Sequence, residues 1–206
     1  MSWEGHIQHI CRKLASANFA INSAKNFMPL KIRKTLYHTI FDSHLNFGLL
    51  LWGCAKNKTI KKVENLQKKC IRNVFLASYK SHTEPIFKKL EILKFKDKIT
   101  LQRSIFMNNY RNKKLPESFN NKFTDITCTD QLQTRHNDYN YQNIPALKKA
   151  LECFPFKCII RTWNSLSIDV KSTADNIDFQ NTLKSELLSK YSRDFKCDDI
   201  TCYSCN

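Results

Sequence analysis

Glycine is almost absent from this chain, whose 206 residues include only Gly5, Gly48 and Gly53. Phosphate-binding loops and dinucleotide fingerprints need several closely spaced glycines, because only glycine lets the backbone approach a phosphate closely. The sequence therefore excludes a nucleotide-binding Rossmann or P-loop enzyme. The same scarcity indicates few tight turns and favours a mainly helical fold.

Two amphipathic helices are predicted at the start of the chain. From Ser2 onward, apolar residues recur every three or four positions up to Ala24, which is the spacing of one face of an α-helix. Pro29 suits the start of a second helix, which we expect to end near Gly48 or Gly53. The apolar stripe of this second helix is formed by Ile32, Leu36, Ile40 and Phe41.

A third helix has the clearest pattern and the most positive charge. Its apolar stripe is formed by Ile60, Val63, Leu66, Cys70, Ile71, Val74 and Phe75. The candidate binding residues lie on or beside its opposite face, and they are Lys61, Lys62, Lys68, Lys69 and Arg72. Two cations of the second helix, Arg33 and Lys34, are assigned to the same surface. We predict that this surface contacts a polyanion.

The positive charge of the chain, +16 in total, is confined to its first half. Residues 1–114 hold 23 Lys and Arg and 6 Asp and Glu, a balance of +17, whereas residues 115–206 hold 11 and 12. Nucleic acid and an anionic membrane surface both fit such a charge, and the charge alone does not choose between them. The charge does indicate that such a partner binds the first half of the chain.

Shorter elements are expected in the rest of the chain. Thr83 and Pro85 are expected to cap and begin one short helix, and Asp97 is expected to cap the next. Residues 117–142 are rich in Asn, Asp and Thr without a steady period, so we expect extended or loop structure. The apolar segment 156–166 fits either a strand or a buried helical turn. A closing helix is predicted from Phe179, Leu183, Leu187 and Leu188.

These elements predict a mainly α protein in three segments. Residues 1–80 form a basic, thumb-like helical bundle, residues 81–116 a helical connection, and residues 117–206 a less regular, partly helical C-terminal segment with a cysteine-containing tail. Apolar residues make up 42% of the chain, which is enough to bury a core. No apolar run approaches the length of about 18 residues that a membrane span needs, so none is expected.

Aromatic residues lie among the cations of the first half. Such a mixture can hold phosphates while rings stack on bases or pack against sugars. We expect Trp52 and Phe75 to lie in the core, and the position of Tyr79 stays open.

No catalytic site is expected. Polymerase and nuclease chemistry needs clustered carboxylates to hold two metal ions. The acids here are scattered, and the one doublet, Asp198 and Asp199, lacks the aromatic residue that stands two positions ahead of a polymerase aspartate pair. None of the six His belongs to a nucleophile or metalloprotease motif.

The cysteines indicate a reducing environment and one candidate metal site. The chain is long for a disulfide scaffold and its first residues lack an apolar signal core, so we expect an intracellular protein, cytoplasmic or nuclear. Cys197, Cys202 and Cys205 have a C-x4-C-x2-C spacing that suits zinc, but they supply only three ligands. The alternatives are a zinc ion with a fourth ligand from elsewhere and three reduced surface thiols. No other cofactor is expected.

Several motifs occur in an order that resembles one known family. They are residues 3–53, LQKKCIRNV, SHTEPIFKKLEILKFKD, TR-H-x-x-Y, WNSL with IDVK, and FQNTLKSELLSKY. Together they are similar to the region that follows the polymerase palm in non-LTR (LINE-type) retrotransposon reverse transcriptases of the jockey and chicken-repeat kind. The resemblance covers nearly the whole chain. It departs from the family at Ser167, where Pro usually follows the WN-x-L motif.

The resemblance implies a non-catalytic piece of an RNA-directed DNA polymerase. Residues up to about 80 are similar to the thumb, which grips the primer and template, and the rest is similar to the C-terminal segment. The palm with its aspartates and metal ions lies upstream in the family. The implied partners are RNA or DNA, contacted through the backbone, and the upstream palm in a longer protein. The alternative is a degenerate or domesticated structural or interaction protein without a specific nucleic-acid role.

Overall fold

The computed structural model describes residues 3–124, 139–142, 154–173 and 175–191. Within these residues the chain is mainly helical, which confirms the predicted fold class. The described residues fall in two compact units. The first unit consists of the residues up to Lys98 together with those from Glu186 onward, and the second unit is Ile99–Ser185. These boundaries differ from the three segments expected from the sequence.

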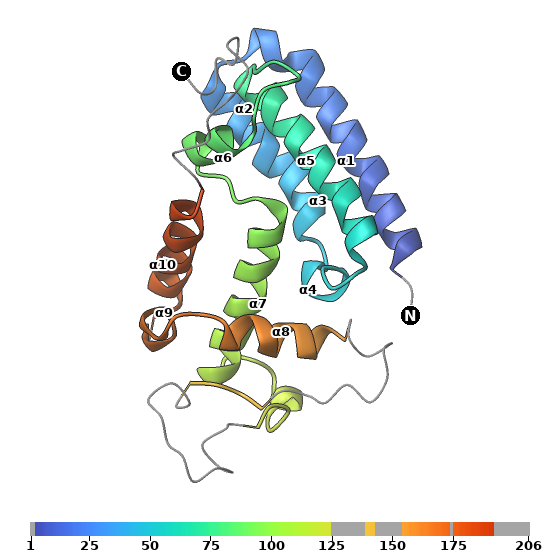
Figure 1. The fold of residues 1–206 in the computed structure, drawn as a ribbon. Helices are drawn as coiled ribbons and strands as arrows, with labels where there is room; N and C mark the ends of the chain where they lie inside the picture. Colours follow the sequence, from blue (N-terminus) through green and yellow to red (C-terminus); the bar gives the residue numbers. More distant parts are fainter. Residues whose placement is uncertain (1–2, 125–138, 143–153, 174, 192–206) are drawn as a thin grey trace. The chain divides into compact units, whose positions relative to one another are not determined.

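The first unit is built on two long helices, α1 (Glu4–Ala24) and α5 (Asn57–Phe75), which lie side by side (Figure 1). Each buries most of the apolar stripe that the sequence predicts. On α5 the fully buried side chains include Val63, Cys70, Ile71 and Val74. A fully buried aliphatic side chain contributes roughly 1.5–3 kcal/mol, so several of them fix the rotation of α5 about its axis.

Three positions of α5 differ from the predicted stripe. Leu66 and Phe75 are only half-buried, whereas Gln67, which the pattern assigns to neither face, is 1% exposed. Its side-chain amide is satisfied, because Nε2 donates to Tyr37 Oη at 2.9 Å and to the Leu93 carbonyl at 3.0 Å. A buried amide with both partners in place costs little.

The predicted second helix is present but its buried face is different. It comprises α2 (Leu30–Leu36), a π-helical segment (Tyr37–Asp42) and α3 (Ser43–Asn46). Arg33, Tyr37 and Phe41 are buried here. Of the predicted stripe, Phe41 is therefore confirmed, whereas Leu36 and Ile40 are only half-buried and Ile32 is 45% exposed.

The end of this second helix is where the sequence placed it. Gly48 has φ +62°, a left-handed conformation that suits glycine, and the short helix α4 (Leu49–Trp52) follows. Trp52 is fully buried, as expected.

Residues 81–98 add α6 (Glu84–Leu90) and the start of α7 (Phe95–Arg111) to the first unit. Thr83 occupies the position before α6, as predicted, although its side chain makes no capping hydrogen bond. The capping role predicted for Asp97 was wrong, because α7 begins two residues earlier. Asp97 lies in the first turn of α7 and accepts a 2.5 Å hydrogen bond from the hydroxyl of Tyr191.

The second unit contains most of α7, then α8 (Pro155–Asn164), α9 (Ile168–Ser172) and most of α10 (Asn176–Ser189). The apolar segment 156–166 is helical, which settles the choice between strand and helix. Trp163 is fully buried and stacks on Phe179 at 6.0 Å between ring centroids. Aliphatic side chains, among them Ile159, Ile160 and Leu183, complete the buried core. Beside it lies a cluster of edge-to-face rings formed by Phe106, Tyr110, Phe119, Phe123, Tyr141 and Phe156.

Side chains of the WNSL motif form hydrogen bonds to an extended segment of the second unit. Trp163 Nε1 donates to the Tyr139 carbonyl at 2.7 Å. The side chain of Asn164 bonds both backbone groups of Tyr141, accepting from its N–H at 3.1 Å and donating to its carbonyl at 2.8 Å. Lys171, from the IDVK motif, is buried and donates from Nζ to Asn140 at 2.9 Å. These motif residues therefore have a structural role, since their partners are backbone groups and the side chain of Asn140 in the same unit.

Candidate nucleic-acid interface

The exposed side of α5 carries a continuous row of cations. Successive residues of an α-helix are about 100° apart, which places six cations within roughly one third of the helix circumference. They are Lys58, Lys61, Lys62, Lys68, Lys69 and Arg72. The four lysines predicted as binding residues, Lys61, Lys62, Lys68 and Lys69, are all exposed. The predicted ribbon is therefore present as a surface.

Arg72 is more firmly held than the lysines. It is half-buried, and its Nε donates to the Ser81 carbonyl at 2.9 Å. Burial lowers the pKa of Arg72, and the nearby Tyr79 opposes this effect. The Arg72 guanidinium lies 6.0 Å from the centroid of the Tyr79 ring. The side chain is thus fixed in position at the carboxyl end of the row.

Arg33 and Lys34 do not belong to this row. Arg33 is only 7% exposed, and burial lowers its pKa. Its Nε and Nη1 have no hydrogen-bond partner within the described part of the chain. Lys34 lies 3.8 Å from Glu91, so its charge is already paired. Arg33 lies on the buried face of α2, so its assignment to the exposed surface was wrong.

Helix α1 adds cations that the sequence alone did not assign to the site. A pocket near the amino ends of the pair is lined by α1 residues between Glu4 and Arg12 and by Thr59 and Lys62 of α5. A second pocket, near the carboxyl ends, is lined by residues between Ala15 and Lys25 and by residues between Leu66 and Tyr79. The two helices therefore run in the same direction. Arg12 and Lys13, both exposed, lie off the apolar stripe of α1. That off-stripe position is the only sequence signal for them, and it does not reveal that α1 lies beside α5.

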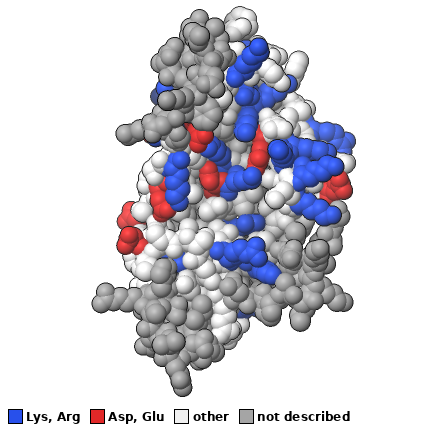
Figure 2. Space-filling model, viewed as in Figure 1, with Lys and Arg blue, Asp and Glu red and all other residues white. Residues whose placement is uncertain are grey.

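The surface shared by α1 and α5, here called the α1–α5 face, is strongly positive. Figure 2 shows Lys and Arg side chains gathered over these two helices. Together the helices hold eight Lys and Arg and two acids, Glu4 and Glu64. Glu64 is 3.3 Å from Lys96, which neutralises it. The remaining field favours an extended anion along the face.

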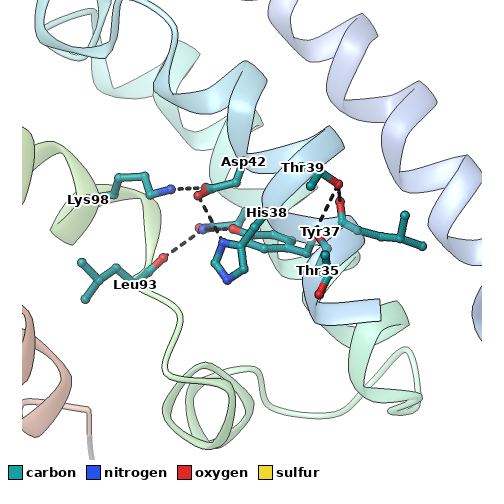
Figure 3. A network of polar contacts seen from close by, with 9 residues as sticks. Thr35, Tyr37, His38, Thr39, Asp42, Leu93 and Lys98 are labelled. Carbon is teal, nitrogen blue, oxygen red and sulfur yellow. Dashed lines mark hydrogen bonds and ion pairs between the residues drawn. The ribbon is translucent and has the colours of Figure 1, made fainter. Parts of the chain in front are cut away.

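A buried polar network holds α5 against the π-helical segment (Figure 3). Gln67 of α5 donates to Tyr37 of that segment, and the segment ends at Asp42. Asp42 forms an ion pair with Lys98, and His38 Nδ1 lies 3.5 Å from its other carboxylate oxygen. Burial raises the pKa of Tyr37 well above its usual value, with the charge of Asp42 adding to the effect. Tyr37 is therefore a neutral structural hydroxyl.

Unfolding in acid should report on Asp42. Burial alone would raise its pKa, but contacts with His38 and Lys98 outweigh burial, and the folded-state pKa lies below the usual value. Such a carboxylate stabilises the fold above its unfolded-state pKa, about 4, and this stability is lost as the pH falls through the lower folded value. We expect the urea midpoint to fall below about pH 4, and Asp42→Asn to reduce that fall. Parallel pH profiles for the two proteins would contradict this account.

The remaining candidate sites lie largely outside the described residues. Cys197, Cys202 and Cys205, proposed as zinc ligands, and the doublet Asp198 and Asp199 are all beyond residue 191. Within the ranges that the structure describes, no group of three or more His, Cys, Asp or Glu is placed to hold a metal ion. Nor does any helix there have the length and apolar character to cross a bilayer.

Comparison with known proteins identifies no relative. No protein-family model, curated protein or solved structure matches the chain. The resemblance to non-LTR reverse transcriptases therefore stays a prediction from the sequence. The described structure is the basis for the function proposed below.

Proposed function

We propose that this chain binds the phosphate backbone of RNA or DNA through the α1–α5 face, as a non-catalytic, thumb-like piece of a retrotransposon reverse transcriptase. The observation that supports it most is the row of exposed cations on α5, held outward by a fully buried opposite face. The sequence resemblance supports the same reading. In this proposal the polymerase palm is a separate region of a longer protein, and this chain binds the nucleic acid without taking part in catalysis.

The dimensions of the row fit a nucleic-acid strand. Lys58 and Arg72 are 14 residues apart along α5, so they are separated by about 21 Å at roughly 1.5 Å per residue. Phosphates along one strand of a duplex recur about every 3.4 Å, so the row spans about six of them. Lysines of this kind act as solvated point charges and do not distinguish bases. Binding should therefore tolerate any sequence.

The test is the salt dependence of binding by the full chain to a labelled duplex or RNA–DNA hybrid. If about five phosphates are neutralised, the logarithm of the affinity should fall with the logarithm of salt concentration at a slope of roughly −4 to −5. Reversing the four exposed lysines of α5 to Glu should lower the affinity at least about tenfold and flatten the slope. The substituted residues are Lys61, Lys62, Lys68 and Lys69.

A matched variant separates the face from the net charge. It reverses four lysines that are also exposed but belong to the second unit, namely Lys113, Lys114, Lys122 and Lys184. Both variants change the formal charge equally, so a difference in affinity must come from position. Equal losses would show that net charge alone explains the binding. No binding by the unaltered chain would leave the structural or interaction protein as the better account.

A further inference from the structure

The α1–α5 face contains a groove near the carboxyl ends of both helices. It has a volume of about 490 Å³ and is lined by residues of α1, Lys25, residues of α5 and the turn after α5. The lining includes three cations, Lys25, Lys69 and Arg72, and no Asp or Glu. Small-ligand sites usually measure about 300–1,000 Å³. The groove therefore has the size and charge for a nucleotide unit of a longer strand.

Amide side chains line this groove in a fixed arrangement. Asn73 Nδ2 donates to Asn18 Oδ1 at 2.8 Å, and Lys25 Nζ donates to Asn73 Oδ1 at 3.3 Å. Asn18 is only 4% exposed, so the packing of α1 against α5 holds the arrangement in place. These two hydrogen bonds occupy both ends of the Asn73 amide, which is therefore a fixed part of the groove wall. Leu66, half-buried, adds an apolar surface beside them.

Two large aromatic rings of the groove are open to solvent. Phe19 on α1 is 72% exposed, and Tyr79 after α5 is 81% exposed. The Arg72 guanidinium lies 6.0 Å from the centroid of the Tyr79 ring. Rings beside cations suit single-stranded nucleic acid, because the cations hold the backbone while unstacked bases stack on the rings. A duplex gains little from such rings, since its bases already stack on one another.

We propose that this groove binds unstacked bases of single-stranded nucleic acid, which stack on Phe19 and Tyr79. Lys69 and Arg72 hold the phosphates next to these bases, and the rest of the α5 row holds the adjoining backbone. The inference rests on the proposed function and adds to it a preference for single strands. It involves no readout of base identity, because every base has a face that can stack.

The test compares two ligands on the full chain at one salt concentration. The ligands are a labelled oligothymidine of about twelve nucleotides, within the usual site size of roughly 4–16, and a duplex of equal length. Phe19→Ala combined with Tyr79→Ala should weaken binding of the single strand at least about tenfold and of the duplex less than about twofold. The salt slope should stay unchanged, because stacking releases no counterions.

Two control variants isolate the rings of the groove. Tyr79→Phe keeps the ring and should bind like the unaltered chain. Phe47→Ala removes an equally exposed ring, 74% exposed, that does not line the groove, and it should have no effect. A loss of the same size for duplex and single strand, or no loss for the single strand, would overturn the inference. The lysine reversals on α5 decide the proposed function separately.

Photo-cross-linking tests the site without any substitution. An oligonucleotide that carries 5-bromouracil should cross-link to the peptide of the unaltered chain that contains Phe19 or Tyr79. Cross-links confined to other peptides would place the bases elsewhere and overturn the inference.

Discussion

Replacing Lys98 with Met is expected to lower the free energy of unfolding of the first unit by about 3–5 kcal/mol, the usual cost of removing one partner of a buried ion pair. Asp42 and Lys98 are each 11% exposed at the side chain, so water does little to compensate the charge that remains. Urea unfolding followed by circular dichroism measures the total loss. Hydrogen exchange should show it first in the π-helical segment Tyr37–Asp42 and its neighbours.

Lys96→Met is the matched control, because Lys96 is on the same helix and also has an acidic partner. Its side chain is 71% exposed, so its pair with Glu64 should contribute at most about 1 kcal/mol. Combining Asp42→Asn with Lys98→Met should cost less than the sum of the two single changes, because no unpaired charge stays buried. Equal losses from Lys96→Met and Lys98→Met would show that the pair is not buried in solution.

Replacing Trp163 with Ala is expected to destabilise the second unit by about 3–5 kcal/mol. The indole ring is fully buried, it stacks on Phe179, and its N–H satisfies the Tyr139 carbonyl. Trp163→Phe keeps most of the packing but leaves that carbonyl without its donor, so we expect a smaller loss of about 1–3 kcal/mol. Both values come from the urea midpoint and slope.

Phe154→Ala provides the comparison for Trp163→Ala. Phe154 directly precedes α8 and is 41% exposed, so removing its ring should cost about 1 kcal/mol or less. If Trp163→Ala is no more harmful than Phe154→Ala, the WNSL motif does not anchor the second unit. If the affinity for nucleic acid falls without a loss of stability, the structural role given to the motif is wrong.

The sequence was sufficient for the helices that bury a long, regular stripe. The first and third predicted helices are α1 and α5, and the lysines of α5 face outward because the opposite face of that helix is fully buried. It was insufficient at the second helix, where a π-helical segment replaces the usual period of 3.6 residues. Arg33, on α2 before this segment, was misassigned because Arg side chains are mostly exposed in proteins. Nothing in a pattern of apolar residues reveals such an inserted turn.

Long-range packing set the other limits of prediction. Gln67 is polar, and only its two partners, 30 and 26 residues away, explain why it is buried. Asp97 looked like a helix cap, but Tyr191, 94 residues further on, binds its side chain instead. The share of α1 in the binding surface depends on its contact with α5. A single sequence contains the residues of these pairs but does not show that they meet.

Because α1 and α5 run in the same direction, their helix dipoles point the same way along the α1–α5 face. Each helix carries a partial positive charge of about half a unit at its amino end and an equal negative charge at its carboxyl end. Because the helices run the same way, these partial charges reinforce each other at both ends of the face. This effect is confined to the first and last turns, so it favours phosphates at the amino ends, while Lys25, Lys69 and Arg72 outweigh the partial negative charge at the carboxyl ends. A bound strand should accordingly make backbone contacts along the whole face, with its unstacked bases at the carboxyl ends, where the aromatic rings lie.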